Sequence, residues 1–181
     1  MNTMNAKTEL ATVVYLLDER GRVCLAQKVS NIHKQGIQLK NSANVWNGYG
    51  GKKLPNESLL QTAIRELFEE SGVRAYEEDL CLVAKINFFW PDSEDSQADM
   101  TVYFFTLIKY KGIPQGKKEM RTPHFFAPDD ILNLNLLPVD RIFLPRILKE
   151  EKLVWDVYLG KRDKNNQVVY KELSEELDLP T

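Results

Sequence analysis

The sequence predicts an α+β protein arranged as an α/β/α sandwich. Three observations support this fold class: repeated apolar runs rich in β-branched and aromatic residues, two segments with helical periodicity, and polar, turn-rich connections between them. The chain has 181 residues, of which 43% are hydrophobic and 28% charged, which is the composition of a soluble globular protein. We therefore expect one domain over residues 1–181, with a core at about 8–159 and a C-terminal hairpin at about 154–173.

The N-terminal part of the chain is expected to begin with a β-hairpin. An apolar run over 10–17 and an alternating segment over 22–28 are joined by the turn sequence Asp-Glu-Arg-Gly. Residues 29–44 are polar, and we expect them to form a loop that is long enough to act as a lid or binding loop. A short strand over 45–51 should then lead through a glycine-rich turn into the first helix.

The first helix is predicted over 57–70, because its apolar residues recur at helical spacing. These residues are Leu60, Ala63, Ile64 and Leu67. Glu57 favours a first helical turn, where a negative charge meets the positive end of the helix dipole. Gly72 lies just beyond the last turn, where a left-handed residue commonly ends a helix.

The remaining strands and helix follow from the second half of the chain. Apolar runs over 81–90 and 100–110 should pair as a hairpin, and a further strand is expected within 119–126. A turn over 127–131 should open a short helix.

A second main helix is predicted over 138–152, with Pro145 either starting or kinking it. Segments 154–159 and 168–173 should form the terminal hairpin.

Three glutamates on the first helix are the main chemical signal. Glu66, Glu69 and Glu70 fall at positions i, i+3 and i+4, so their carboxylates should converge on one side of the helix. Carboxylates that close repel one another, and a hard cation such as Mg²⁺ or Mn²⁺ would relieve the repulsion. A run of glutamates on a helix is otherwise most often a solvated face, so their spacing by itself does not identify a metal site.

The glutamates belong to a longer pattern: G, five residues, E, seven residues, R-E-U-x-E-E-x-G-U, where U is bulky and aliphatic. Its nine fixed positions are Gly51, Glu57, Arg65, Glu66, Leu67, Glu69, Glu70, Gly72 and Val73. All are filled, and the chain strongly resembles the Nudix hydrolases. The resemblance implies a mixed β-sheet between helices, with the motif helix packed against the central strands.

The resemblance also implies roles for these residues. Glu66, Glu69 and Glu70 would bind Mg²⁺, with Mn²⁺ as a substitute, and one of them, for example Glu66, would act as general base. The carbonyl of Gly51 or its neighbour Gly50 would be a further metal ligand. Arg65, counted with the catalytic residues, and Glu57 would hold each other and orient the turn and the helix, while Gly72 is a structural position of the motif.

Four local matches outside the motif resemble the mammalian-type 8-oxo-dGTP diphosphatases of the family, which are MutT-like enzymes of nucleotide pool sanitation. The matches are the segment VWNGYGGK at 45–52, Lys28, the segment EMR at 119–121, and the segment LPVD at 137–140. By this resemblance Glu119 lies beside the metals. Lys28, Asn47, Asp140 and Thr12 would contact the substrate.

Two departures bear on the base that is recognised. The similar enzymes read an oxidised purine with two adjacent acids, whereas this chain has Val139 and Asp140, and their stacking tryptophan is Leu137 here. Asn47 remains, and we favour a base contact for it over a turn role, while Trp46 is expected in the core.

The expected function is a Mg²⁺-dependent nucleoside triphosphate pyrophosphohydrolase that releases a nucleoside monophosphate and pyrophosphate, with oxidised purine nucleotides among the candidate substrates. The alternative enzyme is a nucleoside diphosphate-sugar or dinucleotide hydrolase. From a different class, the chain could be a nucleotide-binding Nudix sensor without catalysis, but a pure binder would not need the full glutamate set.

Charge and targeting features narrow the partners. The net charge of −2 predicts no nucleic acid polymer as partner, and the absence of a signal pattern or a long apolar stretch predicts a cytoplasmic protein with no membrane contact. Cys24 and Cys81 lie in apolar segments and are expected to be buried free thiols. Monomer and homodimer both stay open.

Overall fold

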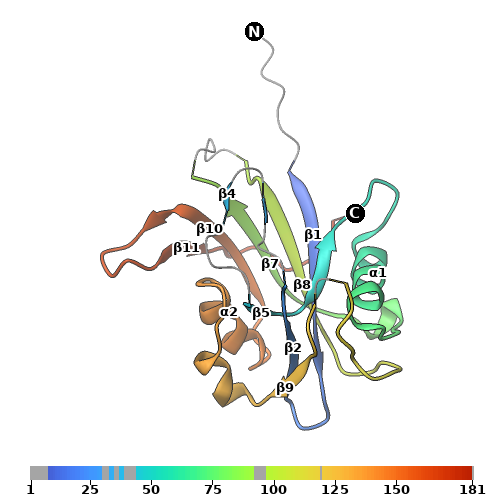
Figure 1. The fold of residues 1–181 in the computed structure, drawn as a ribbon. Helices are drawn as coiled ribbons and strands as arrows, with labels where there is room; N and C mark the ends of the chain where they lie inside the picture. The colour runs from blue at the N-terminus through green and yellow to red at the C-terminus, as the bar shows by residue number, and fades with distance from the viewer. Residues whose placement is uncertain are drawn as a thin grey trace.

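The structure is a computed structural model that describes residues 8–29, 44–91, 97–118 and 120–180, and the backbone of 33–34 and 37–38. Its centre is a nine-stranded sheet with a helix on each side (Figure 1). The strands of this sheet are β1 (Glu9–Leu17), β2 (Val23–Gln27), β5 (Trp46–Asn47), β6 (Tyr49–Lys52), β7 (Cys81–Phe89), β8 (Met100–Leu107), β9 (His124–Phe126), β10 (Leu153–Arg162) and β11 (Val168–Glu172).

The sheet is mixed and its main path runs β11-β10-β7-β8-β1-β2-β5. β1 is parallel to β8 and β10 is parallel to β7, while the other neighbours are antiparallel. The expected mixed sheet between helices is therefore confirmed.

β1 is the strand that positions the glycine-rich turn. One edge of β1 pairs with β8, and its other edge pairs with β6 through residues 11–14 and with β2 through residues 16–17. Gly50 approaches β1 so closely that a Cβ there would lie 1.9 Å from the carbonyl oxygen of Thr12. Only glycine fits at this position, and the turn is thereby held beside Thr12.

Helix α1 (Leu59–Ser71) begins two residues later than predicted. Ser58 is its N-cap and forms a capping box with Gln61: the backbone N–H of each donates to the side-chain oxygen of the other. Glu57 therefore lies before the helix and not in its first turn. Gly72 ends the helix with a φ of 75°, as predicted for a left-handed C-terminal residue.

Alternating residues of the central strands pack into two separate hydrophobic cores, one on each side of the sheet. On one side of the sheet, Val14 and Phe105 pack with Leu67 of α1. On the other side, Tyr15 and Phe104 pack with Phe143 of α2 (Asp140–Ile147), whose ring centroid lies 4.7 Å from that of Phe104. The period of two along β1 and β8 thus gives each helix its own apolar surface, and the predicted sandwich is confirmed.

Several predicted bounds change in the structure. The expected strand over 45–51 is split into β5 and β6, which pair with β2 and β1 respectively. Within the expected loop 29–44, His33–Lys34 (β3) pairs with Ile37–Gln38 (β4), while 30–32, 35–36 and 39–43 lie outside the described residues.

The strand expected within 119–126 is only the three residues of β9. The short helix expected from 127–131 is a 3₁₀ helix, η2 (Pro128–Asn133), and a further 3₁₀ turn, η1 (Glu77–Asp79), follows α1.

The second main helix is also shorter than predicted, since α2 ends at Ile147. Pro145 lies inside this helix rather than at its start, and Glu150 takes a left-handed φ of 65° as the chain turns toward β10. Both cysteines are free, but only Cys24 is buried. Cys81 is exposed because it is the first residue of β7, where the strand leaves the core, so the expectation of two buried thiols is wrong for this residue.

Candidate active site

Two of the three motif glutamates face the glycine-rich turn. The Oε2 atom of Glu70 accepts a hydrogen bond of 2.9 Å from the backbone N–H of Gly50. A Cβ on Gly51 would lie 2.5 Å from Oε1 of Glu66, so the absence of a side chain at Gly51 makes room for this carboxylate. The packing of α1 against β6 therefore places both carboxylates at the same backbone turn.

The expected pair of Arg65 and Glu57 is present. The Nε and Nη2 atoms of Arg65 donate to the two carboxylate oxygens of Glu57 at 2.6 and 3.0 Å, and Nη1 donates to Glu66 at 2.6 Å. Nη2 also reaches the carbonyl oxygen of Lys52 at 3.2 Å. These contacts tie the helix to the turn, and the arginine lowers the pKa of Glu57 to about 2.

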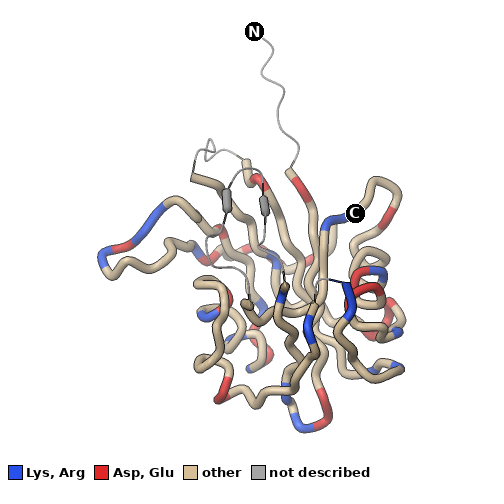
Figure 2. The backbone as a smooth tube through the Cα atoms, viewed as in Figure 1, with Lys and Arg blue, Asp and Glu red and all other residues tan. Residues whose placement is uncertain are grey.

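Glu69 is paired with Lys118, a lysine that no sequence pattern indicated. Its carboxylate forms an ion pair with Lys118, whose hydrogen bond is the main reason that the pKa of Glu69 is lowered. Arg65 lies 3.6 Å from the same carboxylate oxygen. In Figure 2 basic residues, in blue, lie next to the acidic residues of α1, in red, and this ion pair joins the helix to the loop before β9.

Glu70 is the most buried of the three glutamates, with 6% of its surface exposed. Burial raises the pKa of its carboxyl group, although nearby Lys28 and the hydrogen bond from Gly50 act in the opposite direction. A desolvated carboxylate beside a second acid, Glu66, is a group that gains most from a bound cation.

The donors present fit a hard divalent cation, because they are carboxylate and backbone oxygens. Among the described residues no three acidic, histidine or cysteine side chains are close enough to form a metal-binding group. Instead the three carboxylates have separate partners: Glu70 accepts from the Gly50 N–H, Glu66 is paired with Arg65, and Glu69 is paired with Lys118. Glu119, predicted as a further ligand, lies outside the described residues.

A cleft with a volume of about 360 Å³ adjoins the glycine-rich turn. Every residue predicted to contact substrate lines it, together with one predicted metal ligand: Thr12, Lys28, Asn47, Asp140 and Gly51. These residues come from β1, the end of β2, β5, α2 and β6, so the sheet brings distant parts of the sequence to one cavity.

The polar side chains on the cleft wall differ in their hydrogen-bond partners. The Thr12 hydroxyl is buried and has no hydrogen-bond partner among the described residues. The side-chain oxygen of Asn47 accepts a hydrogen bond of 2.8 Å from the backbone N–H of Gly48. Asn47 therefore has the turn role that was the less favoured prediction, while it also lines the cleft, where its amide NH₂ group is a donor.

Asp140 opens α2 and is buried, with 6% of its surface exposed. Leu137 and Val139 line the same part of the cleft as apolar residues. The departures seen in the sequence therefore lie where they can affect ligand binding.

One wall of the cleft was not predicted from the sequence. Trp90 and Pro91 line it from the end of β7, and Arg162 and Val168 line it from the C-terminal hairpin. A Cβ on Gly160 would lie 2.6 Å from the Cα atom of Pro91, so these two segments are in direct contact. No local pattern in the sequence indicates that β10 lies beside β7.

Comparisons with known proteins concern the family and the fold of this chain. The model of the NUDIX domain family matches residues 7–147. An oxidized purine nucleoside triphosphate hydrolase of Mus musculus is 34% identical over 80% of this chain and 83% of its own length, and that of Danio rerio is 32% identical over 81% and 84%.

Among solved structures, a MutT protein of Bacillus halodurans has a TM-score of 0.68 at 17% identity, covering 93% of this chain and 99% of that one. This likeness concerns the fold alone. Taken with the matched motif and the glutamates beside the glycine-rich turn, these similarities confirm the expectation of a Nudix hydrolase, and the chain belongs to the NUDIX domain family.

Proposed function

We propose that this protein is a Mg²⁺-dependent nucleoside triphosphate pyrophosphohydrolase that converts a purine nucleotide to its monophosphate and pyrophosphate. The observation that carries the proposal is the position of Glu66 and Glu70 at a glycine turn that also lines a cleft of nucleotide size. The relatives from mouse and zebrafish, named as oxidized purine nucleoside triphosphate hydrolases, support the substrate class.

The carboxylates of Glu66, Glu69 and Glu70 would hold Mg²⁺, or Mn²⁺ in its place, with the Gly51 carbonyl and Glu119 as further ligands. A divalent cation supplies charge neutralisation on the phosphates and lowers the pKa of bound water. Because Glu66 adjoins Gly51 and is oriented by Arg65, it is our candidate for the general base.

Recognition of the substrate would involve the other polar residues that line the cleft. Lys28 is a cation near Glu70 and would contact the phosphates, while Thr12 and Asn47 offer polar groups along the wall. An ionised Asp140 accepts hydrogen bonds, and guanine presents two donors on one edge, N1–H and the N2 amino group. We therefore propose that guanine nucleotides are preferred over adenine nucleotides.

The apolar side chain of Val139 should affect how well the site distinguishes oxidised guanine from guanine. In the similar enzymes a second acid occupies this position, and two adjacent acids can share a proton and so combine a donor with an acceptor. Here Val139 is buried and supplies neither. Discrimination for the oxidised form of guanine should therefore be weaker than with two acids.

The unit that carries this activity would be one domain. β10 and β11 extend the same sheet as β7, and Arg162 and Val168 complete the cleft, so the C-terminal hairpin belongs to the site.

The proposal is tested by screening the full-length protein for pyrophosphate release from a nucleotide panel, with Mg²⁺ and with excess chelator. The panel includes guanine, adenine, pyrimidine and oxidised purine triphosphates, and sugar nucleotides and dinucleotides. We expect metal-dependent release that is fastest with guanine triphosphates. Preferred cleavage of sugar nucleotides would support the alternative enzyme, and tight binding without cleavage would indicate a sensor.

A further inference from the structure

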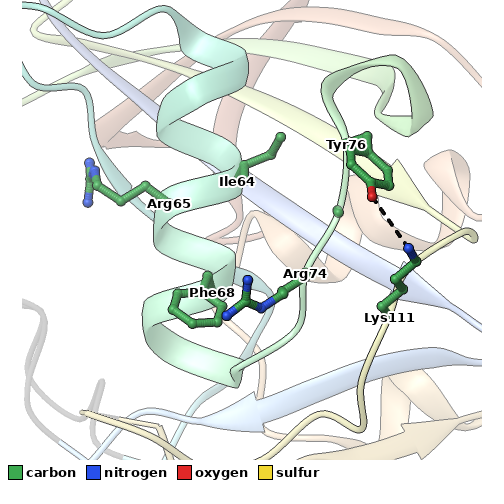
Figure 3. Close-up of a pocket in the computed structure, with 7 residues that line it drawn as sticks. Ile64, Arg65, Phe68, Arg74, Tyr76 and Lys111 are labelled. Carbon is green, nitrogen blue, oxygen red and sulfur yellow. Dashed lines mark hydrogen bonds between the residues drawn. The ribbon is translucent and has the colours of Figure 1, made fainter.

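A second cavity lies on the outer side of α1, between this helix and the segment from Arg74 to Tyr76 (Figure 3). We call it the outer groove; its volume is about 540 Å³. None of the residues that line it lines the cleft described above. Whatever occupies the outer groove would therefore not contact the cleft wall.

Two cations are held opposite one another at the outer groove. The backbone N–H of Arg74 donates to the carbonyl oxygen of Lys111 at 2.9 Å, and the N–H of Lys111 donates back to Arg74 at 2.8 Å. Directly opposed residues of an antiparallel bridge carry their side chains on the same side. The bridge therefore places two basic residues at the outer groove, and like charges at directly opposed positions are unfavourable, which an anion would relieve.

Each of these cations rests against an exposed aromatic ring, as Figure 3 shows. The Cζ atom of Arg74 lies 5.0 Å from the ring centroid of Phe68, and Nζ of Lys111 lies 5.4 Å from that of Tyr76. Lys111 Nζ also donates to the Tyr76 hydroxyl at 3.4 Å. Phe68 is 40% exposed and Tyr76 56% exposed, so each ring still presents apolar surface to a ligand.

The two bridge cations of the outer groove take part in none of the described ion pairs, although the acidic residues Glu77, Glu78 and Asp79 of η1 follow Tyr76 in the chain. In the described parts of the chain no carboxylate pairs with Arg74 or Lys111, and Lys117 adds a further cation 5.5 Å from the Phe68 ring. Arg65, which also lines the outer groove, points away from Lys111 in Figure 3 and is already paired with Glu57 and Glu66. This is a local basic site on a chain whose net charge is −2.

The geometry points to the outer groove as a binding site for a nucleoside phosphate, held independently of metal. Its phosphate would lie between Arg74 and Lys111, and its base would stack on Phe68 or Tyr76. Charge-assisted hydrogen bonds to phosphate and stacking on aromatic rings are how proteins hold nucleotides without reading the base. The volume lies within the ~300–1,000 Å³ of small-molecule sites, which favours a single nucleotide over a nucleic acid strand.

The test is calorimetric titration of the full-length protein with GMP in EDTA, where a metal-dependent site cannot contribute through metal. We expect GMP and AMP to bind with similar affinity, and guanosine or inorganic phosphate to bind at least about tenfold more weakly. Arg74→Gln/Lys111→Gln should weaken GMP binding about ten- to a hundredfold. The matched control Arg20→Gln/Lys149→Gln also removes two positive charges but leaves the outer groove intact, and it should bind as wild type.

Thermal unfolding establishes that each variant is folded, and Phe68→Leu provides a second variant that keeps the charges and removes the ring. Equal GMP binding by wild type and Arg74→Gln/Lys111→Gln would overturn the proposal. So would binding that is lost in Asp140→Ala instead, or binding of a short oligonucleotide without binding of GMP. Because this assay excludes metal, failure of metal-dependent pyrophosphate release would refute the proposed function and leave the outer groove site standing.

Discussion

The two sides of α1 differ in charge and in what surrounds them. On the inner side, Glu66 and Glu70 meet a glycine turn, and Glu70 is buried. On the outer side, Phe68 is exposed and accompanied by Arg74 and Lys117. Acidic residues gather on the inner side and basic residues on the outer side, so we expect ligands of opposite sign: a cation inside and an anion outside.

Arg65 connects the two sides. It lines the outer groove, and its guanidinium group is bonded to Glu57 and Glu66 of the inner side. If the two sides act independently, a substitution on the inner side should leave anion binding at the outer groove unchanged. A substitution at the outer groove should likewise leave metal-dependent activity unchanged. Four substitutions test this separation, in addition to the variants of the outer groove.

The largest effect is expected for Glu70→Gln. The amide keeps the shape of the side chain but removes the charge that would hold a divalent cation, so pyrophosphate release at saturating Mg²⁺ should fall by several orders of magnitude. Glu78→Gln, an exposed residue of η1, is the control and should match wild type. Near-normal turnover of Glu70→Gln, or substantial hydrolysis in excess chelator, would contradict the role of the inner side.

A smaller effect is expected for Asp140→Ala, which changes the base end of the cleft without touching the glutamates. Loss of a buried hydrogen-bonding partner typically costs ~1–3 kcal/mol, so the preference in kcat/KM for guanine over adenine nucleotides should fall about ten- to a hundredfold. Asp130→Ala in η2 is the exposed control. If base preference is unchanged in Asp140→Ala, our model of the pocket is wrong and only the hydrolase assignment survives.

Lys118→Met should strengthen metal binding, whereas Glu70→Gln should weaken it. The Lys118 ammonium group is paired with the Glu69 carboxylate, and a metal must displace it. Removing the lysine should therefore raise the affinity for Mn²⁺ about three- to tenfold, as measured by titration followed by electron paramagnetic resonance. Lys117, the preceding residue, lies over the Phe68 ring on the outer side, so Lys117→Met should leave Mn²⁺ affinity unchanged. Equal affinities in all three proteins would show that the pair does not compete with metal.

The smallest effect concerns Glu57→Gln and the dependence of stability on pH. Arg65 lowers the pKa of Glu57 from 4.5 to about 2 in the folded protein, so the folded state favours the ionised carboxylate. This contribution is present above about pH 4.5 and is lost as the pH falls toward 2. Glu57→Gln should therefore be less stable than wild type in urea at pH 7 and nearly equal to it near pH 2. A constant difference at both pH values would mean that the pair does not act through charge.

The sequence by itself determined the parts of this protein that depend on local spacing. The motif from Gly51 to Val73 predicts the helix that follows the glycine-rich turn, its end at Gly72, and the family to which the chain belongs. The same reasoning could have found the cap, because Ser58 and Gln61 have capping-box spacing. Periodicity also gives the strands, since a helix or strand is specified by residues a few positions apart.

Only the tertiary structure decided which distant segments meet. The parallel pairing of β10 with β7 adds Arg162 and Val168 to the cleft, and the loop before β9 places Lys118 against Glu69. The bridge between Arg74 and Lys111 creates the outer groove from residues 37 positions apart (111 − 74). Such contacts depend on sheet order and loop paths, and these are set by the packing of the whole chain rather than by any local pattern.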